Sequence, residues 1–219
     1  MKSIALIHTV KTVANSFEQQ LKDYVGEPVK IHNLWDDFLA NNPNEIGEFT
    51  IENRCRLYND IKSAEMTGAD MIVVTCSTLT PVVNMIRPFV KVPLIAIDDA
   101  MGRKAVTYGE KILVLATAGS TEGPMREKLN AEAAKLNKTI QIDFKANAEA
   151  FQAMKAVQMD RHDAILLDMA KDISGYDCVV LAQASMAHLD QKIEEICKIP
   201  VLSSPGLCME QVKETLKTI

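Results

Sequence analysis

The sequence predicts an α/β protein of two lobes, each a parallel sheet flanked by helices. Three observations favour this fold class. The chain has 219 residues, enough for one large domain or two small ones. Short aliphatic runs alternate with longer stretches of helical period, which is the pattern that β-α units around a parallel sheet produce. Segments of the first half also recur in the second half in the same order.

The expected elements follow from these runs. Strands are expected at residues 4–7, 71–75, 94–97, 112–116 and 179–181. These runs are almost entirely apolar, as strands covered on both faces of a parallel sheet must be. Helices are expected at residues 14–24, 81–89, 100–106, 124–136 and 188–196.

The internal repeat is the most informative feature of the sequence. The matched segments are 68–79 with 175–186, 92–95 with 199–202 and, with a slip of one residue, 5–9 with 113–117. The first pair aligns without a gap at an offset of 107 residues, which brings Cys76 onto Gln183. An alternative explanation is that any two buried strands after a Gly-x-Asp turn resemble each other. Three matches in one order favour duplication.

A duplicated chain is expected to fold as two similar lobes related by an approximate two-fold axis. The expected lobes are residues 1–97 with 205–219, and residues 98–204. Ligands of open α/β sheets bind outside the carboxyl ends of the strands, so the site is expected in the cleft between the lobes. Residues expected to face each other there are Cys76, Ser77 and Thr78 with Gln183, Ala184 and Ser185, and Thr9 with Thr117.

Composition excludes several classes of protein. Lys and Arg number 24 against 29 Asp and Glu, and a net charge of −5 argues against a nucleic-acid partner. No apolar run approaches the length that crosses a bilayer, and the N-terminus lacks a signal-peptide pattern. Five cysteines without a C-x-x-C pair indicate neither a disulfide framework nor a metal site. We therefore expect reduced thiols and a cytoplasmic location.

Cys76 is the candidate catalytic residue. It leaves a buried strand just before a helix whose start is marked by Ser77, Thr78, Thr80 and Pro81. Unpaired amides at such a turn favour a thiolate and also bind carboxylates. The alternative is a small buried core residue, which is the role expected for the other cysteines, Cys55, Cys178, Cys197 and Cys208.

The motifs around these residues resemble those of the aspartate/glutamate/hydantoin racemase superfamily. Thr75-Cys76-Ser77-Thr78 is similar to its first thiol motif, and Ala116-Thr117-Ala118-Gly119-Ser120-Thr121 to its Ala-Thr-x-Gly-Thr loop. The resemblance extends over nearly the whole chain. It implies cofactor-independent removal of a proton from the carbon next to a carboxylate, with one cysteine on each face of that carbon.

The sequence departs from the family pattern at the second thiol, where Gln183 stands. A neutral amide takes no proton near neutral pH, so Gln183 is expected to bind rather than react. A one-thiol site remains, the mirror arrangement of arylmalonate decarboxylase in the same superfamily. The residues expected to hold an anionic intermediate are Thr9, Ser77, Thr78, Thr117, Ser120 and Thr121.

Histidines supply the alternatives for a second acid–base group. His8 ends the first strand and is either a second base or a polar residue with its hydrogen bonds satisfied. Ser185 is a further candidate binding residue, and His188 is either solvated or functional. His32 and His162 are assigned to structure.

The predicted function is a cofactor-independent racemase-superfamily enzyme that acts on a small carboxylate or amino acid through Cys76. The first alternative is a decarboxylase or cis-trans isomerase that uses the same thiol. The second is a binding protein that has kept the anion pocket and lost catalysis. No cofactor, metal, nucleic acid or membrane is expected, and a homodimer is the expected assembly.

Overall fold

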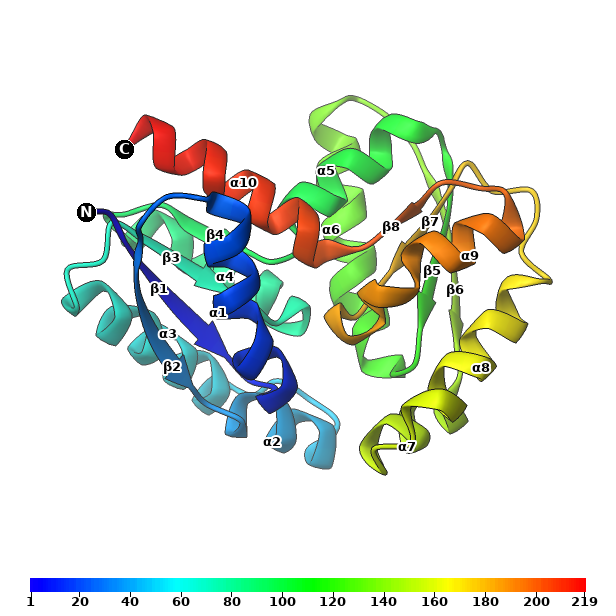
Figure 1. Ribbon diagram of the computed structural model, residues 1–219, viewed down its shortest axis with the longest axis horizontal. Coiled ribbons are helices and arrows are strands. Elements are labelled where there is room, and N and C mark those ends of the chain that lie inside the picture. The colour runs from blue at the N-terminus through cyan, green and yellow to red at the C-terminus, as the bar shows by residue number, and fades with distance from the viewer. The chain divides into compact units, whose positions relative to one another are not determined.

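Two parallel four-stranded sheets form the framework of the protein, in a computed structural model that describes residues 1–219 (Figure 1). The strand orders are β2-β1-β3-β4 and β6-β5-β7-β8. The chain divides into two compact units, Met1–Asp99 with Pro205–Ile219 (unit 1) and Ala100–Ser204 (unit 2). Each unit contains one sheet, so the predicted fold class is confirmed.

Unit 1 is built on a sheet of parallel strands. The strands are β1 (Ser3–His8), β2 (Lys30–Trp35), β3 (Met71–Val74) and β4 (Leu94–Ala96). The helices are α1 (Lys11–Val25), α2 (Phe38–Ile46), α3 (Ile51–Met66), α4 (Thr80–Ile86) and α10 (Ser204–Thr218). Ile7 and Val74, which pair across β1 and β3, share one buried cluster with Leu57 and Ile61 of α3. This face of the sheet therefore carries a closed apolar core.

Unit 2 repeats this plan. The strands are β5 (Lys111–Ala116), β6 (Gln141–Ala146), β7 (Cys178–Leu181) and β8 (Val201–Leu202). The helices are α5 (Asp99–Tyr108), α6 (Glu122–Lys135), α7 (Ala148–Lys155), α8 (Met159–Ala170) and α9 (Asp190–Cys197). Leu115 and Leu181 pair across β5 and β7 and are buried with Leu166 of α8 and Ile193 of α9.

The Gly-x-Asp segments of the sequence repeat have the same structural role in both units. Gly68 and Gly175 both adopt left-handed backbone, with φ of 75° and 78°, a conformation that favours glycine. The Asp70 carboxylate accepts hydrogen bonds from the Ser3 amide (2.7 Å) and hydroxyl (3.0 Å). Asp177 accepts bonds from the amides of Glu110 and Lys111 at 2.7 and 2.8 Å. Each aspartate thus ties the start of the third strand to the start of the first.

Several elements lie outside the sequence prediction. The edge strands β2 and β6 contain mostly polar or half-exposed residues, so they lack the apolar run that marks the inner strands. The expected helix at 81–89 is α4 followed by a separate 3-10 turn, Arg87–Phe89, with Pro88 in its first positions. The expected helix at 188–196 likewise starts as the 3-10 segment Ala184–Leu189 before α9. No helix is both long enough and apolar enough to cross a membrane.

Candidate functional site

The carboxyl ends of the central strands position the predicted site residues of each unit. In unit 1, β1 and β3 pair in register through Ile7 and Val74, and the Thr75 amide continues the ladder to the Ile7 carbonyl at 2.9 Å. Two residues further, Thr9 and Cys76 leave the sheet on neighbouring strands. In unit 2 the same register leads from Leu115 and Leu181 to Thr117 and Gln183.

Cys76 is half-buried at the end of β3. Its backbone is extended (φ −126°, ψ 114°), and it is followed by the 3-10 turn Ser77–Leu79. Leu79 is fully buried in the unit 1 core and its amide bonds the Cys76 carbonyl at 3.1 Å, which fixes the turn. The Cys76 Sγ lies 3.0 Å from the Thr78 Oγ1. A hydroxyl at this distance can donate to the sulfur and stabilise a thiolate.

Thr9 is buried, at 3% exposure, and its Oγ1 has no hydrogen-bond partner. Buried hydroxyls are rarely left unpaired, so this oxygen needs an explanation. The next residue, Val10, is the N-cap of α1 and has no side-chain capping bond. The first turn of α1 contains no acidic residue and starts with Lys11. The start of α1 is therefore a locally positive element beside a hydroxyl that has donor and acceptor capacity to spare.

His8 is held in a chain of polar contacts. The Asn33 amide nitrogen donates to Glu18, so its Oδ1 is the atom that lies 3.1 Å from the His8 Nε2. The Nε2 is then the donor to Asn33, and the Nδ1 lies 2.8 Å from the Thr75 Oγ1, whose hydroxyl donates to the Ile7 carbonyl at 3.1 Å. His8 is fully buried, and burial lowers its pKa below the ordinary 6.5. A neutral imidazole with both nitrogens engaged is in the environment of a structural residue, so we leave His8 out of the proposed chemistry.

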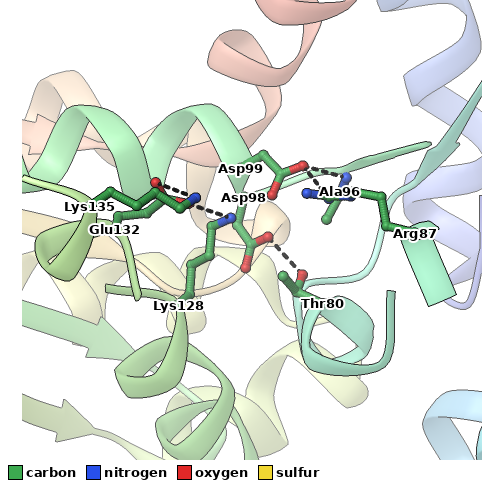
Figure 2. A network of polar contacts seen from close by, with 8 residues as sticks. All are labelled: Thr80, Arg87, Ala96, Asp98, Asp99, Lys128, Glu132 and Lys135. Carbon is green, nitrogen blue, oxygen red and sulfur yellow. Dashed lines mark hydrogen bonds and ion pairs between the residues drawn. The ribbon is translucent and has the colours of Figure 1, made fainter. Parts of the chain in front are cut away.

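Buried carboxylates connect the end of β4 to the turn after β3 (Figure 2). The Thr80 hydroxyl donates to the Asp98 Oδ1 at 2.7 Å. Asp99 accepts from the Ala96 amide at 2.9 Å and from the Arg87 guanidinium at 2.7 Å. These contacts anchor α4 and so stabilise the turn that carries Cys76.

Gln183 closes the corresponding turn of unit 2. Its Oε1 accepts three hydrogen bonds, from the Thr117 amide (2.7 Å), the Thr117 hydroxyl (3.0 Å) and the Ala118 amide (3.3 Å). The Thr121 hydroxyl donates to the Ala118 carbonyl at 2.8 Å, which completes the turn, whereas Ser120 is exposed. The predicted anion-holding residues therefore differ between the units. In unit 2 the buried hydroxyls bond within the protein, while in unit 1 Thr9 does not.

The remaining histidines and Ser185 lie around the 3-10 segment after Gln183. Ser185 is half-buried. Asp163 of α8 contacts the buried His162 through its Nδ1 (2.7 Å) and the exposed His188 through its Nε2 (2.9 Å), and the two rings stack. His162 is structural in this setting, and His188 is both solvent-exposed and hydrogen-bonded.

The other cysteines do not share the environment of Cys76. Burial raises the pKa of Cys178 to about 12 and raises the pKa of Cys208 further, so both remain thiols. The Sγ of Cys197 lies 3.6 Å from the Ile199 carbonyl oxygen. Cys55 was expected to be a buried structural residue, and this is wrong, because it lies on the exposed side of α3. All five cysteines are unpaired, and no cluster of three or more His, Cys, Asp or Glu could hold a metal ion.

The polar groups at the end of β2 were not predicted, because β2 itself was not predicted. Asp36 follows this strand, is buried, and forms an ion pair with Arg56. Burial, and then the neighbouring Asp36, raise the pKa of Asp60 to about 7. Trp35, the last residue of β2, is 52% exposed, and the Lys11 ammonium lies 5.8 Å from the centre of its ring. Residues 31–34 read apolar, polar, polar, apolar, so no period-2 alternation marks this strand in the sequence.

Comparison with known proteins gives a consistent result. Residues 4–212 match the family model described as Asp/Glu/Hydantoin racemase. Among solved structures, a glutamate racemase from Bacillus anthracis aligns with 99% of this chain and 82% of its own, at a TM-score of 0.75 and 14% identity. An allantoin racemase from Klebsiella pneumoniae aligns with 100% of this chain and 89% of its own (TM-score 0.68, 15% identity). At these identities the structures share the fold.

Two further matches extend this result. A putative Asp/Glu racemase from Yersinia pestis aligns with 98% of this chain and 99% of its own, at a TM-score of 0.73 and 18% identity. An uncharacterized protein of Schizosaccharomyces pombe is 21% identical over 70% of this chain. The chain spans 66% of the length of that relative.

Proposed function

Because the chain belongs to the Asp/Glu/hydantoin racemase family, we propose that it is an enzyme that transfers a proton at the carbon next to a carboxylate, with Cys76 as the acid–base group. The observation that carries the proposal is the position of Cys76. It is a half-buried thiol at the carboxyl end of a central strand, 3.0 Å from the Thr78 hydroxyl. Cys178 and Cys208, by contrast, are buried with raised pKa values.

In the proposed reaction the Cys76 thiolate removes the hydrogen on the α-carbon as a proton. The electrons of the C–H bond move into the carboxylate, which becomes an enolate-like dianion, and the sulfur becomes a thiol. Return of a proton to carbon restores the thiolate. Hydrogen-bond donors around the carboxylate stabilise the added charge, and we assign this task in unit 1 to Thr9, Ser77 and Thr78. The proposed ligand is a small carboxylate or amino acid, with no cofactor.

A second candidate reaction, decarboxylation, is favoured by one observation, the amide of Gln183 in place of a second thiol. When CO2 leaves a malonate-type substrate, the electrons of the C–C bond form the enolate, and a single thiol then delivers the proton to one face. Racemisation needs proton transfer on both faces of the carbon, so it needs a second acid–base group.

Hydrogen exchange in D2O tests the proposed function. Candidate amino acids, hydroxy acids and substituted malonates are incubated with the enzyme, and loss of the α-proton signal or of CO2 is followed by NMR. We expect one class to react, and Cys76→Ser to abolish the reaction. The matched control is Cys55→Ser, which removes an exposed thiol outside the site and should react as the wild type does.

Alkylation of the thiol separates catalysis from binding alone. Because Cys55 is exposed, iodoacetamide is applied to the Cys55→Ser protein and each cysteine is quantified by mass spectrometry. We expect Cys76 to react fastest at pH 7 and to be protected by malonate. Equal rates at Cys76 and Cys197 would contradict a catalytic thiol. Protection of Cys76 without any exchange or decarboxylation would support the non-catalytic carboxylate-binding protein instead.

A further inference from the structure

We infer that Gln183 is an internal ligand that closes the strand-end turn of unit 2, so that the substrate carboxylate is held in unit 1 and proton transfer reaches one face of the substrate carbon only. This inference rests on the proposed function and restricts it to a single stereochemical course. It makes Gln183 a specificity-determining residue, although it takes no part in proton transfer.

The hydrogen bonds of Gln183 carry the inference. One carbonyl oxygen, the Oε1, accepts from the Thr117 amide, the Thr117 hydroxyl and the Ala118 amide, all within 3.3 Å. An amide carbonyl has two lone pairs, so three donors exceed its usual number of bonds. Convergent donors of this kind are the arrangement that binds a carboxylate or phosphate oxygen. Gln183 therefore occupies with its own side chain the position that an anion oxygen would take.

Unit 1 lacks this internal ligand. Cys76 occupies the position that Gln183 has in unit 2, and its sulfur contacts Thr78 of its own turn. The hydroxyl of Thr9, the residue equivalent to Thr117, is buried without a partner. The two turns are thus related by the repeat but differ in state: one has its donors satisfied within the protein, and the other has hydrogen-bonding capacity left over.

The chemical consequence is a reaction with one stereochemical outcome. Gln183 supplies neither a proton nor a site for one near neutral pH. A ligand carboxylate could bind the amides of Thr117 and Ala118 only by displacing the Gln183 side chain. Because Gln183 belongs to the same polypeptide, it competes with the ligand at every ligand concentration. Proton exchange at an α-carbon is then expected for one enantiomer without racemisation, and a prochiral malonate is expected to give one enantiomer of product.

Amide chemical shifts test this inference directly, with malonate as the probe. In wild-type protein we expect the Thr117 and Ala118 amides to be protected from hydrogen exchange and unmoved by malonate. In Gln183→Ala the same two signals should move with malonate concentration and approach a plateau, which gives a Kd that the unmoved wild-type signals do not. Gln183→Glu is the matched control, because its carboxylate accepts the same bonds and keeps the turn closed.

The two claims fail in different ways. Movement of the Thr117 and Ala118 amides in wild-type protein, or their rapid hydrogen exchange, overturns the inference even if Gln183→Ala does not fold. Unmoved signals in a folded Gln183→Ala variant also overturn it. The other outcome is that the Thr117 and Ala118 amides behave as expected, the Ser77 and Thr78 amide signals do not move with malonate, and no substrate reacts. The proposed function is then wrong, whereas the inference that Gln183 closes its turn is supported.

Discussion

Replacing Gly175 by alanine tests the backbone geometry that the repeat encodes. Gly175 has a φ of 78°, and an added Cβ would meet no heavy atom within 4 Å, so the entire native-state cost is conformational. Left-handed backbone costs an L-residue roughly 1–2 kcal/mol. The lower entropy of the unfolded alanine chain returns about 0.4–1 kcal/mol of this. We therefore expect Gly175→Ala to lower the free energy of unfolding by about 1 kcal/mol.

Urea denaturation followed by circular dichroism measures this change. With a slope of about 2 kcal/mol per molar, a loss of 1 kcal/mol moves the midpoint down by about 0.5 M. Gly68→Ala, at a φ of 75°, should behave alike in unit 1. The control is Gly206→Ala in α10, where an added Cβ is also unopposed but φ is ordinary, and the lower entropy of the unfolded alanine chain predicts a gain of about 0.4–1 kcal/mol. Shifts of the same sign at Gly175 and Gly206 would refute the reasoning.

Four further outcomes are expected. Asp60 has a folded pKa of about 7, well above its unfolded value, so the free energy of unfolding should decrease as the pH rises from about 4 to 7. Asp60→Asn should remove this pH dependence in urea titrations. His8 has a lowered pKa, so stability should fall as the pH drops below 6.5, and His8→Gln should flatten this acid limb. Val157 is exposed and left-handed (φ 58°), so Val157→Gly should raise the thermal midpoint, and an unchanged midpoint would contradict the strain. An added Cβ at Gly109 would lie 2.2 Å from the Asp177 carboxylate. Gly109→Ala should therefore break the hydrogen bonds from the Glu110 and Lys111 amides to Asp177 and speed hydrogen exchange of the Lys111 amide.

The inner strands were predictable from the sequence because burial on both faces leaves a local apolar signature. Residues 71–75 and 179–181 were expected as strands, and β3 and β7 lie there. The repeat predicted two similar lobes, and the two sheets have equivalent strand orders. The Gly-x-Asp turn before each of these strands contains one left-handed glycine and one carboxylate acceptor. The edge strands β2 and β6 were missed because their partly exposed residues have no such signature, whereas β4, at the other edge of its sheet, is buried and was expected at 94–97.

The candidate site was predictable as positions but not as contacts. Ligands of a parallel sheet bind outside the carboxyl ends of its strands, and Cys76 and Gln183 follow strands at such positions in the sequence. Sequence spacing could not show that Gln183 binds the turn at Thr117 or that His8 bonds Asn33, because these contacts join segments that are 66 and 25 residues apart. The expectation that the strand ends of the two lobes face each other stays a prediction.

The chain passes through the two units in different ways, which has a consequence for folding during synthesis. Unit 2 is continuous from Ala100 to Ser204, whereas unit 1 needs both Met1–Asp99 and Pro205–Ile219. The last helix buries Cys208 and Val212, and the Lys213 ammonium bonds the Tyr24 carbonyl of α1 at 3.0 Å. During synthesis on the ribosome, the second half can therefore finish first. Unit 1, which contains Cys76, is complete only once residues 205–219 have been made.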